Sequence, residues 1–187
     1  LRDMDDAADG GKVKERYNGS GATVRGFNVE GRAAFTRWFE LQAGVTLQQS
    51  RYKEPEFWSE DAEVPPVRRM FRTPDAYGYF TASFKPVRNF TADLSGTCTG
   101  SMLVQHMAGS GVAQDVAVST PSFFDMNIRL SYDVRIYKEI TMQLYGGVQN
   151  LFNAYQKDFD KGVDRDSGYI YGPSLPRSLV FGAGLSF

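Results

Sequence analysis

The sequence predicts an all-β fold: an antiparallel up-and-down meander of about seven strands that forms a segment of a transmembrane β-barrel. Three observations support this prediction. Apolar and polar residues alternate in seven segments, short and long connections alternate between them, and the chain is rich in Phe and Tyr, with 14 and 10 among 187 residues. Strand side chains alternate between the two faces of a sheet, so each segment builds one apolar and one polar face. Membrane barrels place short turns on one side and long loops on the other.

The longest alternation covers residues 124–137. Every even position from Met126 to Ile136 is apolar or aromatic, and every odd position from Asp125 to Arg135 is polar or charged. Strands usually stop after about 5–6 residues, whereas a tilted membrane strand needs about 9–11. We therefore expect the even positions to face lipid and the odd positions to face a barrel lumen. The candidate lumen-facing charges are Asp125, Arg129, Asp133 and Arg135.

Six further segments share this two-residue period and are expected to be strands. They cover residues 22–35, 39–48, 77–84, 90–98, 140–149 and 179–187. Short links at 37–38, 86–89 and 137–139 predict hairpins, whereas 54–73, 105–120 and 156–172 have no period and predict long loops. Residues 150–155 break the alternation and are interpreted as one helical turn. The polar residues 1–20 are interpreted as a lead-in or loop, and 21–187 as the barrel segment.

Composition excludes several classes of function. The net charge of -1 and a pI of about 5.9 give no electrostatic case for nucleic-acid binding. No run of about 18 apolar residues predicts a transmembrane helix. A mean hydropathy of -0.37 is compatible with a membrane barrel, because half of each barrel strand is polar. The single Cys98 cannot form an internal disulfide.

No residue pattern predicts catalysis, and no cofactor is expected. His106 is the only histidine, and a serine hydrolase would need it beside a nucleophile and an orienting acid. Ser101 and Ser110 are near it in sequence, but no G-x-S-x-G pattern surrounds them. We therefore interpret all three as loop residues of a protein that is not an enzyme.

An acidic stretch in the third long loop is the one candidate metal site. Hard cations prefer clustered oxygen ligands, and four aspartates occur here at near-alternate positions. The EF-hand pattern fails, because Gly162 and Tyr169 occupy ligand positions, and Lys157, Lys161 and Arg165 neutralise the charge. We interpret the stretch as a solvated, salt-bridged loop without a metal. The four candidates are Asp158, Asp160, Asp164 and Asp166.

Three stretches resemble a known family. Residues 147–155 contain Asn-Leu-Phe followed by Tyr155, residues 171–177 contain Gly-Pro followed by Pro-Arg, and residues 120–132 lead into the longest alternating segment. In this order and spacing they resemble the C-terminal barrel portion of TonB-dependent outer-membrane receptors, of the kind common in the Bacteroidetes. The resemblance covers about residues 22–187.

The C-terminal end resembles the assembly signal that the barrel-insertion machinery recognises in this family. Gly182, Leu185 and the terminal Phe187 match the expected glycine, hydrophobic and aromatic positions. Val180 stands where a polar residue is expected, which is a departure from the signal.

The resemblance implies a role and a set of partners. The parent protein would take up a siderophore, a cobalamin or a glycan across the outer membrane, energised by TonB through a plug domain that this chain lacks. Outer-membrane lipid and the barrel-insertion machinery would be the other partners. Seven strands leave two bare edges, whereas single-chain bacterial barrels have an even number of strands. We therefore expect a fragment of a larger receptor, which when isolated could form an edge-to-edge homodimer.

Two alternatives stay open. A complete small outer-membrane barrel, acting as an adhesin or structural protein, would need an eighth strand from residues 1–20. A soluble β-sandwich or lipocalin-like binding domain would instead point Ile128, Leu130 and Val134 into a dry core.

Overall fold

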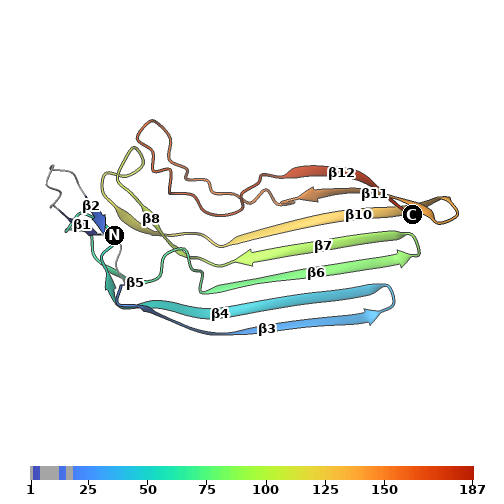
Figure 1. Ribbon diagram of the computed structural model, residues 1–187, viewed down its shortest axis with the longest axis horizontal. Coiled ribbons are helices and arrows are strands. Elements are labelled where there is room, and N and C mark those ends of the chain that lie inside the picture. The colour runs from blue at the N-terminus through green and yellow to red at the C-terminus, as the bar shows by residue number, and fades with distance from the viewer. Residues whose placement is uncertain (1, 5–12, 16–18) are drawn as a thin grey trace.

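Seven long strands form one antiparallel meander in the computed structural model, which describes residues 2–4, 13–15 and 19–187. They follow one another across the sheet, and Figure 1 shows the short turns at one end and the long connections at the other. This confirms the predicted all-β meander. The strands are β3 (Ala22–Thr36), β4 (Phe39–Glu56), β6 (Ala76–Val87), β7 (Phe90–Thr99), β10 (Phe123–Tyr137), β11 (Ile140–Gln149) and β12 (Ser178–Ser186).

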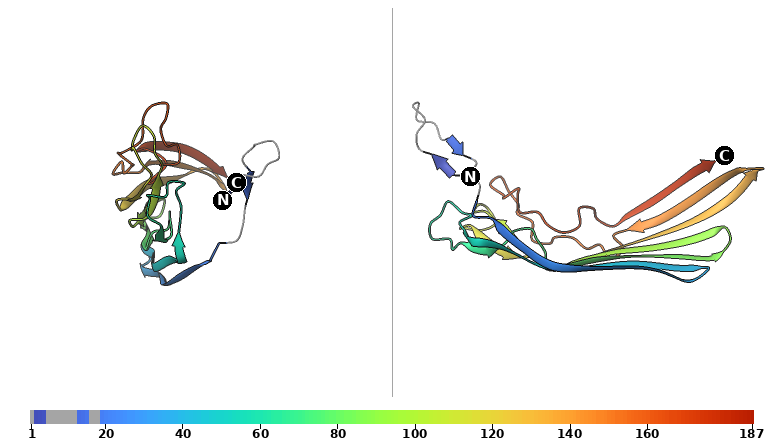
Figure 2. Two further views of the ribbon diagram at one scale, coloured as in Figure 1. Left: turned by 90° about the vertical axis from the view of Figure 1, so that its left-hand side faces the viewer. Right: turned by 60° about the horizontal axis from the view of Figure 1, so that its bottom comes forward.

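The sheet is a single curved layer with two free edges. Figure 2 shows the curvature, and β3 and β12 lie at the two ends of the strand order, each pairing on one side only within the described residues. A sandwich needs a second sheet packed on the first, and the described strands outside the main sheet form only two small two-stranded sheets. The architecture is that of a piece of barrel wall.

Strand register keeps the two faces of the sheet separate across all seven strands. Leu94 of β7 lies opposite Ile128 of β10, and Ser83 of β6 lies opposite Asp93 of β7. Large side chains of the apolar face are open to the surroundings, with Phe27 60% and Phe181 75% exposed. Exposed apolar surface on this scale marks contact with lipid or with another protein.

Aromatic rings cover glycines of neighbouring strands on both faces. A Cβ atom at these glycines would press against or collide with the opposing ring. The absence of a side chain at each glycine therefore makes room for the ring. Such cross-strand pairs stabilise sheets where glycine would otherwise leave a gap. The pairs are Phe80 with Gly96 and Phe181 with Gly146 on the apolar face, and Tyr79 with Gly44 and Tyr145 with Gly182 on the polar face.

The long loops contain short strands that the sequence did not predict. β4 continues to Glu56, beyond the expected loop start at residue 54, and pairs there with β5 (Val67–Arg69). In the second loop β8 (Leu103–His106) pairs with β9 (Val116–Ser119) as a separate hairpin. Segments of three or four residues are too short to show a period, so alternation could not reveal them.

Residues 150–155 form a turn, and the predicted helical turn is wrong. Asn150 and Asn153 have φ angles of 49° and 52°, in the left-handed region, and the Asn153 amide donates to the Asn150 carbonyl at 2.8 Å. The Asn150 side chain donates to the carbonyls of Ala154 and Leu175 and accepts from the Ala154 amide. Asparagine tolerates the left-handed region and bonds its own backbone neighbours, which explains the turn.

Only part of the predicted lead-in, 1–20, lies within the described residues. There, β1 (Arg2–Met4) and β2 (Val13–Glu15) pair with each other in a small separate sheet. Neither adds a strand to the main sheet, as the small-barrel alternative would require. Across residues 2–4, 13–15 and 19–187 the structure has no helix long and apolar enough to cross a membrane.

Candidate functional site

The polar face of the sheet carries a hydrogen-bonded side-chain network, and we take it as the first part of the candidate site. Gln143 donates to Asp133 at 3.0 Å and accepts from Arg129 at 3.4 Å. The Arg129 guanidinium also lies 4.1 Å from the centre of the Tyr145 ring, a cation–π distance. Two of the predicted lumen-facing charges are therefore joined through an amide rather than by a direct ion pair.

Polar side chains of the same face also bond to one another on the strands nearer the N-terminus. Gln42 donates to Glu30 at 2.8 Å and to the Tyr79 hydroxyl at 3.2 Å. Arg32 and Glu40 form an ion pair. A hollow of about 510 Å³ lies over β7, β10 and β11, and its polar lining includes Asp93, Ser95, Asn127 and Arg129. The polar face thus presents both charge signs around one open volume.

The other two predicted lumen-facing charges lie toward opposite ends of β10. Asp125 lines a smaller hollow of about 270 Å³ with Phe123 and Gly172, and its buried Oδ1 has no hydrogen-bond partner in the described part of the chain. Arg135 is exposed beside Lys138 and Glu139 at the turn end. All four charges share one face, as the period predicted.

The second part of the candidate site is a packed group of loop residues, which we call the loop cluster. Its buried apolar members are Val104, Phe123, Tyr169 and Tyr171. The His106 ring stacks on the Tyr169 ring with centroids 3.7 Å apart and planes 5° from parallel. Arg72 of the first loop donates to the carbonyls of Gly168 and Ile170 at 2.5 and 2.9 Å. The three long loops therefore form one packed unit above the sheet end.

Asp158 is held in the loop cluster by two tyrosine hydroxyls. Tyr169 donates to its Oδ2 at 2.7 Å, and Tyr171 donates to its Oδ1. Burial opposes ionisation of this carboxyl, but the hydrogen bonds from Tyr171 and Tyr169 outweigh it and hold the pKa of Asp158 below its usual value. Burial and the bond to Asp158 raise the pKa of Tyr171 to about 12, and raise the pKa of Tyr169 for the same two reasons.

Asp160 pairs with His106, 54 positions away in sequence. The His106 Nε2 lies 2.9 and 3.0 Å from the two carboxylate oxygens, and both side chains are buried. An ionised carboxylate only accepts hydrogen bonds, so Nε2 carries the proton. This hydrogen bond, with a further one from the Asp166 amide, outweighs burial and lowers the pKa of Asp160.

The remaining two aspartates also serve the loop structure. Asp166 accepts from the amides of Met107 and Gly168 at 2.8 and 2.7 Å, while the Asp164 carbonyl accepts from the Ser110 amide at 3.0 Å. No group of three or more His, Cys, Asp or Glu side chains is placed to hold a metal ion in the described ranges.

Among the described residues, the acidic stretch forms no salt bridge with lysine or arginine. The ion pairs of the described residues do not include Lys157, Lys161 or Arg165, and the aspartates bind tyrosine, histidine and backbone donors instead. Of the serines near His106 in sequence, the Ser110 hydroxyl donates to the Lys161 carbonyl at 2.6 Å. The Ser101 backbone carbonyl accepts from Arg69 at 2.8 Å.

The residues of the proposed assembly signal lie on or just beyond β12. Gly182 faces the polar side beneath the Tyr145 ring, and Leu185 points to the apolar side, where it is exposed. Phe187 follows the last residue of the strand and is fully exposed. Figure 1 places this end of the chain beside the short turns.

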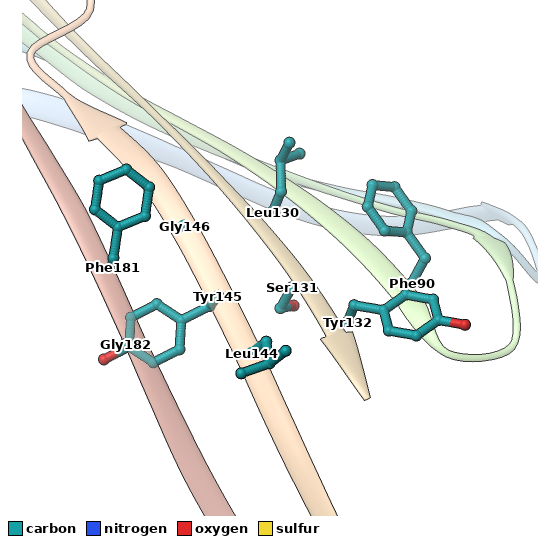
Figure 3. A pocket seen from close by; sticks show the side chains of 9 residues that line it. All are labelled: Phe90, Leu130, Ser131, Tyr132, Leu144, Tyr145, Gly146, Phe181 and Gly182. Carbon is teal, nitrogen blue, oxygen red and sulfur yellow. The ribbon is translucent and has the colours of Figure 1, made fainter. Parts of the chain in front are cut away.

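A shallow hollow of about 630 Å³ interrupts the apolar face over Gly146. Leu130, Leu144 and Phe181 line it, and Figure 3 shows Phe90 and Tyr132 at the end opposite Phe181.

No protein-family model and no curated protein matches the sequence. One solved structure that is similar is the ferric-catecholate import receptor Fiu from E. coli K12 in its closed form, with a TM-score of 0.61 and 20% sequence identity. The match covers 95% of this chain and 22% of that chain. The chain has the fold of a β-barrel segment. It spans about a fifth of the length of Fiu.

The stability of the packed loop cluster should fall at both low and high pH. The unfolded aspartates bind more protons than the folded ones near their usual pKa, so stability should fall as pH drops below about 4. Tyr171, with its pKa raised to about 12, favours the packed state below about pH 10 and loses that contribution above it. Near-UV circular dichroism of the packed tyrosines should show both transitions. Asp158→Asn should weaken the acid transition, and an unchanged acid limb would contradict the assignment.

Proposed function

We propose that this chain is the C-terminal barrel segment of a TonB-dependent outer-membrane receptor that takes up a scarce nutrient. The observation that carries the proposal is the seven-stranded meander, which matches part of an import receptor over 95% of its length. The exposed apolar face and the networked polar face support it, because a large barrel needs one face toward lipid and one toward its lumen.

The remaining roles follow from this placement. The polar face lines the lumen, the short turns point to the periplasm and the loop cluster points outward. The barrel-insertion machinery reads Gly182, Leu185 and Phe187, and TonB acts through the plug domain of the parent protein. The free edges of β3 and β12 pair with further strands of that barrel, or with each other between two copies of an isolated chain. The transported solute belongs to the siderophore, cobalamin or glycan class.

A genetic experiment in the producing organism tests this function. The parent gene should encode a plug domain and more alternating strands upstream of Leu1, and its product should fractionate with the outer membrane. Deleting the gene should abolish uptake of one of the three solute classes, and inactivating TonB should abolish the same uptake. Recovery of the product in the soluble fraction, or unchanged uptake of all three classes, would reject the proposal.

A further inference from the structure

Charge is distributed unevenly between the two ends of the sheet. The neighbouring turns 36–39 and 84–90 contain Arg37, Lys85 and Arg88 and no acidic residue. The first long loop at the other end differs, since residues 53–75 carry six acidic and four basic side chains. The positive charge at the turn end is therefore local rather than a property of the whole surface.

The two turns are one structural unit. β4 pairs with β6, and the Lys85 amide donates to the Trp38 carbonyl at 2.7 Å. The Trp38 ring packs edge-on against Phe84 with centroids 5.1 Å apart. This contact ties the tryptophan of one turn to the strand end of the next.

The three cations of this unit have no ion-pair partner in the part of the chain that the structure describes. Arg37, Lys85 and Arg88 are exposed and form none of its salt bridges. Of the nearby acids, Glu40 forms its ion pair with Arg32 while the charge of Lys85 also acts on it, and Asp133 accepts a hydrogen bond from Gln143.

The apolar part of the unit lies at the end of the apolar face. Trp38, which follows Arg37 in the chain, is 42% exposed, and Val87, which precedes Arg88, is 60% exposed. Tryptophan and long cationic side chains favour the interface of a bilayer, where rings meet acyl chains and charged ends reach phosphates. Guanidinium groups bind phosphate oxygens with two parallel hydrogen bonds.

We propose that the turns 36–39 and 84–90 form a binding site for an anionic phospholipid of the phosphatidylglycerol type. Arg37, Lys85 and Arg88 hold the headgroup phosphate, and Trp38 and Phe84 lie against the upper acyl chains. The lipid belongs to the leaflet next to the short turns. This inference rests on the proposed function, in which the apolar face of the sheet meets the lipid bilayer. The turn 137–139 is not part of this binding site, because it carries the acidic Glu139 beside Lys138.

Trp38 provides a local reporter for this site. The chain has two tryptophans, so Trp58→Phe leaves Trp38 as the only one. Trp58 lies in the first long loop, where its ring packs on Phe71 and phenylalanine preserves an aromatic contact. The full 187-residue chain is placed in bilayers of phosphatidylcholine mixed with either brominated phosphatidylglycerol or brominated phosphatidylcholine, and quenching of Trp38 reports which lipid lies beside it.

We expect phosphatidylglycerol to be preferred at Trp38 by roughly fivefold or more, the gain that one interfacial cation supplies. The triple variant R37Q/K85Q/R88Q should abolish this preference. The matched variant K53Q/K157Q/K161Q removes the same charge from exposed lysines at the loop end and should keep it. Higher salt should weaken the preference.

Four results would overturn the site. Equal quenching by the two lipids in the parent chain would remove the preference itself. An equal loss in both triple variants, at unchanged β-sheet content by far-UV circular dichroism, would show diffuse surface charge instead. Displacement of phosphatidylglycerol from Trp38 by lipid A would assign the phosphate to the other leaflet. Quenching by neither brominated lipid would reject the membrane placement as well, whereas the other three results leave it standing.

Discussion

Gln156→Leu should release the third long loop and raise its rate of trypsin cleavage roughly thirtyfold or more. Gln156 is only 1% exposed, donates to the Tyr169 carbonyl at 3.1 Å and accepts from the Tyr171 amide at 2.9 Å. Leucine fills a similar volume but leaves both backbone groups buried and unpaired. Each unpaired group costs about 1–3 kcal/mol, so the packed loop loses about 2–6 kcal/mol against its open form.

Trypsin can measure this opening directly, because Lys157, Lys161 and Arg165 lie in the same loop. Cleavage at these three bonds is followed by mass spectrometry under conditions in which the strands stay intact. Gln149→Leu is the matched control, since Gln149 is an exposed residue of β11 and its side chain anchors no loop. Equal cleavage of the two variants would show that Gln156 does not hold the loop.

The strands could be predicted from the sequence because the same two-residue alternation repeats in each of them. A two-residue alternation over ten or more positions assigns each side chain to one face of the sheet. A register slip by one residue would move every side chain of that strand to the opposite face. β10 shows this well: the odd positions from Asp125 to Arg135 lie on one face, as the alternation predicted, and pair with the polar positions of β7 and β11. The short links predicted three of the six neighbouring pairs as hairpins, since short connections join antiparallel neighbours.

The loop cluster was not accessible in the same way, because its contacts join distant residues without a period. His106 and Asp160 are 54 positions apart, and Arg72 reaches carbonyls 96 and 98 positions away. Residue type alone singled out the aspartates near Asp158, but charge counting suggested lysine and arginine partners. Tyrosine hydroxyls and a histidine took those places because the site is packed and aromatic. Asn150 carries a local signal that the helical-turn prediction overlooked, since asparagine is enriched in the left-handed region.

Leu94→Arg should destabilise the folded chain in a bilayer by about 2–4 kcal/mol, the cost of a cation on a lipid-facing barrel surface near mid-depth. Leu94 lies near the middle of β7, a strand paired on both sides, and opposite Ala82 and Ile128 of the apolar face. Ser95→Arg is the matched control: it adds the same charge one residue away, on the polar face, where Ser95 borders the hollow of about 510 Å³. There the new cation stays hydrated and lies on the same face as Asp93, so a change below about 1 kcal/mol is expected.

Urea titration in lipid vesicles, followed by the mobility of the folded band in unheated gels, compares the two variants. A larger loss for Ser95→Arg would mean that the polar face meets lipid, which would reverse the assignment of both faces and reject the barrel-wall placement.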